Sequence, residues 1–229
     1  MSNITNNLNK VLDRISGAAD KAGRDLTSIK LIVVTKTQPI SMVQEVRRAG
    51  ATNFGENRVQ EAIEKFDSDD TTGLHMIGPL QRNKAKFAVK IFNMIQSVDR
   101  FELGKELDRR LEVLEKSMPI LIQVNTSLEA SKAGVNPDQA LELVGQLSTL
   151  KWLSIKGLMT IPEFKLDPED SRPAFRLLRE IRDQITSAGI SGVSMDFLSM
   201  GMSHDFEVAI DEGADMVRVG TAIFGPRQG

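Results

Sequence analysis

The chain contains no cysteine and no tyrosine, and only two of its residues are histidine. Without cysteine it can form neither a disulfide nor a thiolate metal site, and two histidines are too few to favour a zinc or iron centre. The formal net charge is −2, with no block of Lys or Arg. This balance argues against nucleic acid or an anionic membrane as the main partner.

Long hydrophobic runs are absent as well. No apolar stretch of the sequence approaches the roughly 20 residues needed to span a bilayer. The N-terminal segment is polar and rich in Asn, and it lacks the apolar core of a signal peptide. We therefore expect a cytoplasmic protein that does not act at a membrane.

The composition is that of an ordinary globular domain, with 229 residues, 41% hydrophobic and 26% charged. Short apolar runs alternate with amphipathic stretches along the whole chain, and no Pro/Gly/Ser-rich linker or repeat interrupts them. We expect a single domain over residues 1–229, in which residues 1–29 form an N-terminal helix and the lead-in to the first strand.

Eight apolar runs are predicted strands: 31–35, 53–54, 76–77, 94–96, 120–124, 155–158, 197–199 and 216–219. Helical patterns cover 4–22, 41–49, 58–66, 83–92, 100–116, 137–149, 172–187 and 203–212. Strict alternation of strand and helix indicates a parallel sheet. Eight such units favour an α/β fold of the closed (β/α)8 TIM barrel type, and an open doubly wound sheet is the alternative.

Lys36 is the most informative residue. It follows the first predicted strand, and because strand side chains alternate between faces, it shares a face with Ile32 and Val34. Burying an ammonium without a partner is costly, so a lysine held there can lose its proton and form a Schiff base with an aldehyde or ketone. The alternative is a lysine that extends past the strand end to water.

Arg218 lies in the last predicted strand and shares a face with Met216 and Gly220. An arginine inside a barrel needs a specific partner. Gly220 permits close backbone approach, Thr221 offers a hydroxyl, and the loops after strands seven and eight are the recurring phosphate site of this fold. A plain turn is the alternative at these two residues.

The end of the seventh predicted strand adds to this pattern. Ser199 and Gly201 can supply a further hydroxyl and N–H, whereas Ser203 has a competing role as the N-cap of the next helix. A lysine that forms an imine beside a phosphate cradle describes two classes of protein. One contains the Schiff-base aldolases that bind sugar-phosphate ketones, and the other binds pyridoxal 5′-phosphate (PLP), with a side chain such as Arg218 at the pyridine nitrogen.

Longer motifs extend from about residue 31 to the C-terminus. They are Val-Thr-Lys-Thr at 34–37, Phe-Gly-Glu-Asn at 54–57, His-Met-Ile-Gly-Pro-Leu-Gln at 75–81, Gln-Val-Asn at 123–125, Ser-Lys-Ala-Gly at 131–134, Gly-Leu-Met-Thr-Ile-Pro at 157–162, Ser-Met-Gly-Met-Ser at 199–203 and Val-Arg-Val-Gly-Thr-Ala-Ile-Phe-Gly at 217–225. With these motifs in this order, the chain resembles the pyridoxal phosphate homeostasis proteins of the YggS/PROSC type.

The resemblance implies one barrel similar to the N-terminal domain of alanine racemase, with PLP held on Lys36 as an internal aldimine. By position it implies phosphate contacts from Ser199, Gly220 and Thr221, and a contact from Arg218 to the pyridine nitrogen. It also implies that Asn57 lies near the cofactor and that Met159 packs on its ring. A loop-capping amide is the alternative role for Asn57.

The same residues argue against catalysis. Arginine cannot accept a proton from the pyridine nitrogen, and alanine racemases that share this feature add a tyrosine acid/base and a second domain, whereas this chain has no tyrosine. His75 and His204 could substitute, but a structural and a surface role, respectively, are the expected alternatives.

We therefore expect a monomeric, non-catalytic PLP carrier or regulator in vitamin B6 and amino-acid homeostasis, with apo-PLP enzymes as recipients. A minor amino-acid racemase or lyase and a Schiff-base aldolase are the rival hypotheses. The roles of Lys132 and of the acidic segment 67–70 stay open.

Overall fold

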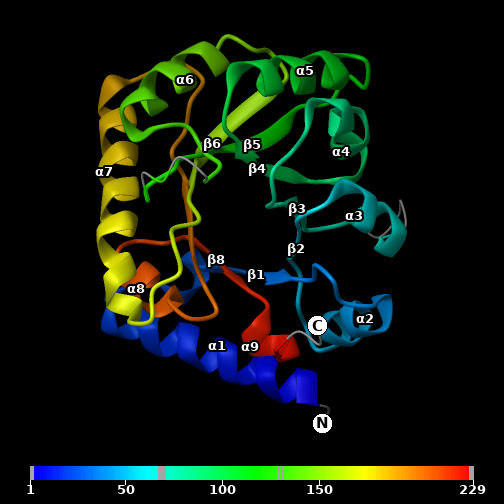
Figure 1. The fold of residues 1–229 in the computed structure, drawn as a ribbon, viewed down its shortest axis with the longest axis vertical. Coiled ribbons are helices and arrows are strands. Elements are labelled where there is room, and N and C mark those ends of the chain that lie inside the picture. The colour runs from blue at the N-terminus through cyan, green and yellow to red at the C-terminus, as the bar shows by residue number, and fades with distance from the viewer. Residues whose placement is uncertain (1–2, 67–70, 128, 130–131, 227–229) are drawn as a thin grey trace.

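Eight parallel strands close into a barrel in sequence order, each paired with the next (Figure 1). The computed structural model describes residues 3–66, 71–127, 129 and 132–226. Its strands are β1 (Lys30–Val34), β2 (Phe54–Glu56), β3 (Leu74–Met76), β4 (Met94–Val98), β5 (Met118–Gln123), β6 (Leu153–Met159), β7 (Phe197–Met202) and β8 (Met216–Val219). The pairing of β1 with β8, from Lys30 opposite Met216 to Val33 opposite Val219, closes the ring and excludes the open sheet.

The helices of the described residues surround this barrel (Figure 1). They are α1 (Asn3–Lys21), α2 (Ile40–Arg48), α3 (Val59–Lys65), α4 (Ala85–Ile91), α5 (Phe101–Glu112), α6 (Ala140–Leu147), α7 (Arg172–Ala188), α8 (Phe206–Asp211) and α9 (Thr221–Phe224). No helix among them is long and apolar enough to cross a membrane. The acidic segment 67–70 lies outside the described residues.

Two apolar layers hold the barrel together. The outer layer fills the space between strands and helices, where the faces of the helices bury their apolar side chains. The inner layer is small and is formed by Ile32, Met94, Leu121, Met159 and Met216. Strand side chains alternate between the two faces of a strand. The inward-facing residues that come after this inner layer along each strand therefore lie at the carboxyl end of the barrel.

The N-terminal helix α1 packs beside α8 and α9 (Figure 1). Its buried apolar residues recur at helical spacing: Ile4, Leu8, Val11 and Ile15. Asn7 donates a side-chain hydrogen bond of 3.0 Å to the carbonyl of Ile223, and Arg14 forms an ion pair of 2.7 Å with Glu207. The N-terminal segment thus supports the elements that follow β7 and β8.

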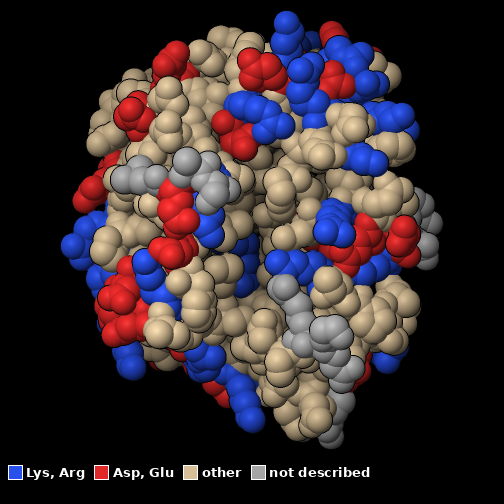
Figure 2. Space-filling view, in the orientation of Figure 1, with Lys and Arg blue, Asp and Glu red and all other residues tan. Residues whose placement is uncertain are grey.

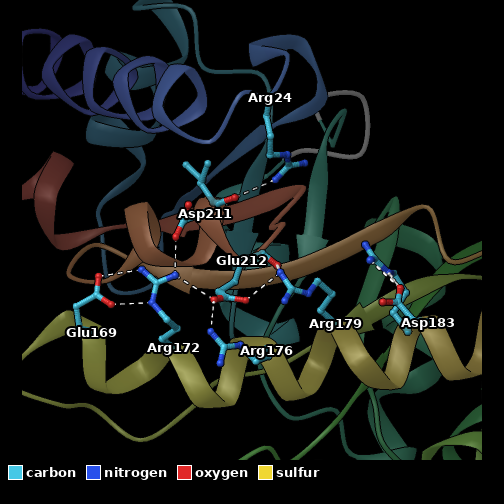
Figure 3. Close-up of polar contacts among 10 residues, drawn as sticks. Arg24, Glu169, Arg172, Arg176, Arg179, Asp183, Asp211 and Glu212 are labelled. Carbon is cyan, nitrogen blue, oxygen red and sulfur yellow. Dashed lines mark hydrogen bonds and ion pairs between the residues drawn. The ribbon is translucent and has the colours of Figure 1, made fainter.

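An ion-pair cluster fastens α7 to the end of α8 (Figure 3). The carboxylate of Glu212, whose side chain is 4% exposed, contacts Arg172 at 3.0 Å, Arg176 at 3.2 Å and Arg179 at 2.9 Å. Arg172 also pairs with Asp211 at 2.5 Å. These contacts anchor the segment that leads directly into β8.

Candidate cofactor site

A cavity of about 500 Å³ opens at the carboxyl ends of β1, β7 and β8. Its lining includes Lys36, Ser203, Arg218, Gly220 and Thr221. The space-filling view shows the surface hollowed near its centre, where β1 and β8 lie in Figure 1, and basic side chains (blue) lie in the hollow (Figure 2). This is the end of the barrel at which active sites of this fold are found.

Lys36 lies two residues beyond β1 and is half-buried in the cavity wall. The backbone just before Lys36 is still hydrogen-bonded to β2, because the N–H of Thr35 donates to the carbonyl of Gly55 at 3.1 Å. Val34 lines the same cavity, as expected for residues two apart on a strand face. The side of the strand that carries Lys36 therefore faces the cavity.

Arg218 is buried in the barrel interior opposite Ile32, with 3% of its surface exposed. Its Nη1 donates to Ser199 Oγ at 2.6 Å and its Nη2 donates to the carbonyl of Thr160 at 2.6 Å. Burial lowers the pKa of Arg218 to about 10, with the charge of Asp205 opposing this shift. The guanidinium is therefore cationic at neutral pH, and two of its nitrogens are held, one by Ser199 on the neighbouring strand β7 and one by Thr160, the residue after β6.

A chain of buried hydrogen bonds continues from Arg218 across the barrel. Ser199 donates to Gln96 Oε1 at 2.7 Å, and Gln96 Nε2 donates to Nδ1 of His75 at 2.7 Å. Because Arg218 only donates and an amide nitrogen does not accept, this order of donors leaves Nδ1 of His75 unprotonated. Burial, with a smaller effect from the charge of Lys30, lowers the pKa of His75 to about 4, so its ring is neutral at pH 7.

His75 and Gln96 differ from what the sequence predicted. His75 lies within β3 rather than before the strand, and it reaches Arg218 through the hydrogen-bond chain. Gln96 was not among the candidate residues. The one signal that could have found it is its position as a polar residue in the buried strand β4, where an unsatisfied amide would be costly.

The N–H groups at the start of α9 converge on one hydroxyl. Ser203 Oγ accepts hydrogen bonds of 3.3 Å from the N–H groups of both Gly220 and Ala222. The expectation that Ser203 is the N-cap of the next helix is wrong, because Asp205 holds that position and its Oδ1 accepts the N–H of Met202 at 2.7 Å. Ser203 faces the cavity instead, and Thr221 beside it is exposed.

Two glycines at this end of the barrel meet different constraints. A Cβ at Gly220 would lie 3.1 Å from the carbonyl oxygen of Val34, so this glycine allows β1 and β8 to approach closely at the cavity. Gly201 has φ of +88°, and a Cβ there would lie 2.6 Å from Cβ of Ala209. Gly201 therefore permits β7 to pack on α8, and it does not line the cavity.

The structure thus brings four of the candidate residues to the cavity wall: Lys36, Arg218, Gly220 and Thr221. Ser199 joins them through its hydrogen bond with Arg218. Met159 is fully buried in the inner apolar layer, and Asn57 is half-buried directly after β2. A Cβ at Gly78 would come 2.4 Å from the carbonyl oxygen of Asn57, so Asn57 is tightly packed against the β3 end.

The mouth of the cavity is bordered by residues that the sequence analysis did not place there. Phe164 and His204 both line the cavity, and their rings lie 5.2 Å apart between centroids. Nε2 of His204 lies 3.0 Å from the carbonyl oxygen of Leu166. The loop after β6 is thereby joined to the loop after β7 beside the opening. Lys132, in contrast, is exposed.

Comparison with known proteins first defines the class of fold. The family described as "Alanine racemase, N-terminal domain" matches residues 4–228. The solved alanine racemase of Clostridium difficile 630 superposes with a TM-score of 0.80 at 15% identity, over 100% of this chain and 58% of that chain. This similarity shows the fold, an alanine racemase-like TIM barrel, and confirms the predicted architecture.

More similar relatives define the family. The pyridoxal phosphate homeostasis protein of Aquifex aeolicus (strain VF5) is 42% identical over 228 residues, which are 99% of each protein. The structure of PipY of Synechococcus elongatus PCC7942 with PLP bound has a TM-score of 0.80 at 34% identity, over 94% of this chain and 100% of that chain. This chain belongs to the pyridoxal phosphate homeostasis protein family.

Proposed function

We propose that this chain binds PLP covalently through Nζ of Lys36 and holds it for release to other proteins, without catalysing a reaction of its own. The observation that carries the proposal is the shared cavity, in which a lysine, a buried arginine and a pair of backbone N–H groups face the same space. When bound, PLP supplies an aldehyde that reacts with amines and a ring that withdraws electrons.

The phosphate of PLP fits the end of the cavity at Ser203, Gly220 and Thr221. The N–H groups of Gly220 and Ala222 already point at one acceptor, the hydroxyl of Ser203. A phosphate oxygen is a stronger acceptor than a hydroxyl because hydrogen bonds to charged groups are stronger. The exposed hydroxyl of Thr221 can add a further donor. Direct phosphate contact from Ser199 and Gly201 stays a prediction.

The position of Arg218 suits the pyridine nitrogen. A guanidinium has no lone pair to offer and cannot take up or hand over a proton near neutral pH, so it favours an unprotonated ring nitrogen. A ring in that state withdraws electrons less strongly. Arg218 is also fixed on two sides by Ser199 and Thr160, so its orientation does not depend on the ligand.

Few groups around the cavity can move protons. Besides Lys36 and Arg218, the titratable residues that line its described part are His204 and Asp205. His204 contacts the carbonyl of Leu166, and buried Asp205 accepts the N–H of Met202. Racemisation needs a proton donor and acceptor on each face of the substrate. Because His204 and Asp205 are already engaged in these hydrogen bonds, the site supports a carrier better than a racemase. Apo-PLP enzymes as recipients and a monomeric state remain predictions.

Two assays on the purified holo-protein test the carrier role. The first follows reactivation of an apo-PLP enzyme by the holo-protein, with free PLP at equal concentration as the reference. The second measures racemisation and elimination of L-amino acids. Transfer without turnover supports the proposal, whereas steady turnover that Lys36→Ala abolishes would replace the carrier with an enzyme. Imine trapping with a sugar phosphate, without visible absorbance, would favour the aldolase.

A further inference from the structure

Three charged residues outside the cavity lie against the segment that carries Lys36. They are Glu56, the last residue of β2, and Glu61 and Lys65 of α3. Nζ of Lys65 lies 3.1 Å from Glu56 Oε1 and 2.5 Å from Glu61 Oε1. We call these three residues the Lys65 cluster.

The Lys65 cluster contacts both chain neighbours of Lys36. Thr35 Oγ1 donates to Glu56 Oε1 at 2.7 Å, and Nζ of Lys65 donates to the carbonyl of Thr35 at 2.7 Å. On the other side, the backbone N–H of Thr37 donates to Glu61 Oε1. The residues on both sides of Lys36 in the chain, Thr35 and Thr37, are therefore held by hydrogen bonds to the same cluster.

The backbone at this point needs such support. Thr37 has φ of +64°, a left-handed conformation that is unfavourable for a β-branched residue. Residues in this region keep such a conformation only when their surroundings impose it. The bond from Thr37 to Glu61 is a contact that imposes it. Since Thr35 faces the cluster, strand alternation turns Lys36 toward the opposite side, which is the cavity.

The cluster is poorly explained by stability alone. The side chain of Glu56 is 0% exposed, and its Oε2 has no hydrogen-bond partner in the described structure. Burial raises the pKa of Glu56, and the contacts with Thr35 and Lys65 offset this only in part. Buried ion pairs are often no more stable than well-packed apolar residues. A fully buried carboxylate placed against the turn that carries Lys36 points to a role in geometry.

We propose that the Lys65 cluster positions Lys36, holding the turn at residues 35–37 so that its amine stays inside the cavity as a nucleophile. This deepens the proposed function and rests on it for its purpose. Lys36 lines the same cavity as Arg218. Without the cluster, the left-handed turn at Thr37 would lose the contact that imposes it, and the amine of Lys36 would no longer be directed into the cavity.

The test measures the reactivity of Lys36 without using PLP. The protein is treated briefly with formaldehyde and cyanoborohydride at pH 7.5, and the methylation of Lys36 is compared with that of exposed Lys10 on α1 by peptide mass mapping. In Glu61→Ala the ratio of Lys36 to Lys10 methylation should fall by about fivefold, the effect of one lost hydrogen bond. Glu61→Gln keeps an acceptor for Thr37 and should stay near the wild-type ratio.

Two further variants complete the design. Lys65→Met keeps the aliphatic stem but removes the donor to Thr35, so its ratio should also fall; it serves if Glu61→Ala does not fold. Glu106→Ala removes comparable ion pairs with Arg109 and Arg110 on α5 and should leave the ratio unchanged. Melting temperatures recorded for every variant separate loss of fold from loss of position.

An unchanged or raised ratio in folded Glu61→Ala and Lys65→Met would overturn the positioning role, and so would an equal fall in Glu106→Ala. PLP binding is measured separately by visible absorbance of the wild-type protein. A wild-type protein that binds no PLP, together with a reduced ratio in Glu61→Ala, would reject the proposed function and leave the positioning role in place.

Discussion

Arg218 and Ser199, on the neighbouring strands β8 and β7, share a hydrogen bond of 2.6 Å in the barrel interior. The hydroxyl of Ser199 in turn donates a hydrogen bond to Oε1 of Gln96, and Nε2 of Gln96 donates one to Nδ1 of His75. A cationic side chain at the cavity is thus connected to a neutral imidazole on the opposite part of the barrel. In this structure Ser199 orients Arg218.

Ser199→Ala tests this hydrogen-bond chain. The substitution leaves Nη1 of Arg218 and Oε1 of Gln96 without their present partner, and an unsatisfied buried group costs about 1–3 kcal/mol. We expect the free energy of unfolding in urea to fall by this amount and PLP retention to weaken. The matched control is Ser97→Ala, because buried Ser97 Oγ has no hydrogen-bond partner in the described structure. Equal losses in the two variants would contradict the account.

The neutral state of His75 predicts a dependence of stability on pH. Its pKa is about 4 in the folded protein and ordinarily 6.5, so below pH 6.5 the unfolded chain binds a proton that the folded protein does not. The free energy of unfolding should therefore fall as the pH drops from about 6.5 to 4, by at most about 1.4 kcal/mol per pH unit from this group.

Urea unfolding at several pH values measures this slope. His75→Asn keeps an acceptor near Nδ1 but does not titrate, so it should show a smaller slope between pH 6.5 and 5, where carboxylates contribute less. Identical slopes in the variant and the wild type would show that His75 is not held neutral.

Thr221→Val tests the proposed phosphate end of the cavity. The substitution keeps the shape of the side chain but removes its hydroxyl, and a hydrogen bond to a charged group is worth about 1.5–3 kcal/mol. The dissociation constant for PLP, measured by absorbance titration, should rise accordingly. Thr221→Ser retains the hydroxyl and should bind nearly as the wild type does. Equal affinity of the Thr221→Val and wild-type proteins would remove Thr221 from the proposed phosphate site.

Glu212→Gln tests the ion-pair cluster between α7 and α8 (Figure 3). Neutralising this buried carboxylate removes the negative charge that Arg172, Arg176 and Arg179 share and leaves a neutral amide in its place. We expect a loss of about 1.5–3 kcal/mol in the free energy of unfolding. Asp183→Asn, at an exposed pair with Arg182, should cost less than about 1 kcal/mol. Comparable effects would show that the cluster adds nothing beyond a surface ion pair.

The barrel could be predicted because its pattern is repeated eight times along the chain. Strand pairs such as β1 and β8 are rich in apolar residues bounded by turns, and this signal survives errors in any one strand. The weakest predictions were the short strands: 53–54 became Phe54–Glu56 and 76–77 became Leu74–Met76. Three-residue strands carry too little periodicity for their ends to be located.

Lys36 and Arg218 could be found because each is a charged residue on an apolar strand face. Gln96 and the Lys65 cluster could not, because their roles depend on contacts between strands and helices that are distant in sequence. Ser203 was assigned to the wrong partner for a related reason. A serine before a helix is a frequent N-cap, and only the fold shows that the start of α9 lies closer to its hydroxyl.

The central claim is that Lys36 holds PLP, and one measurement tests it most directly. The visible spectrum of the purified protein is recorded with added PLP, the product is reduced with borohydride, and the modified peptide is identified by mass mapping, in the wild type and in Lys36→Ala. The account predicts a yellow wild-type protein with the reduced adduct on Lys36, and a folded variant without that absorbance. Unchanged absorbance in Lys36→Ala, or an adduct on another lysine, would contradict it.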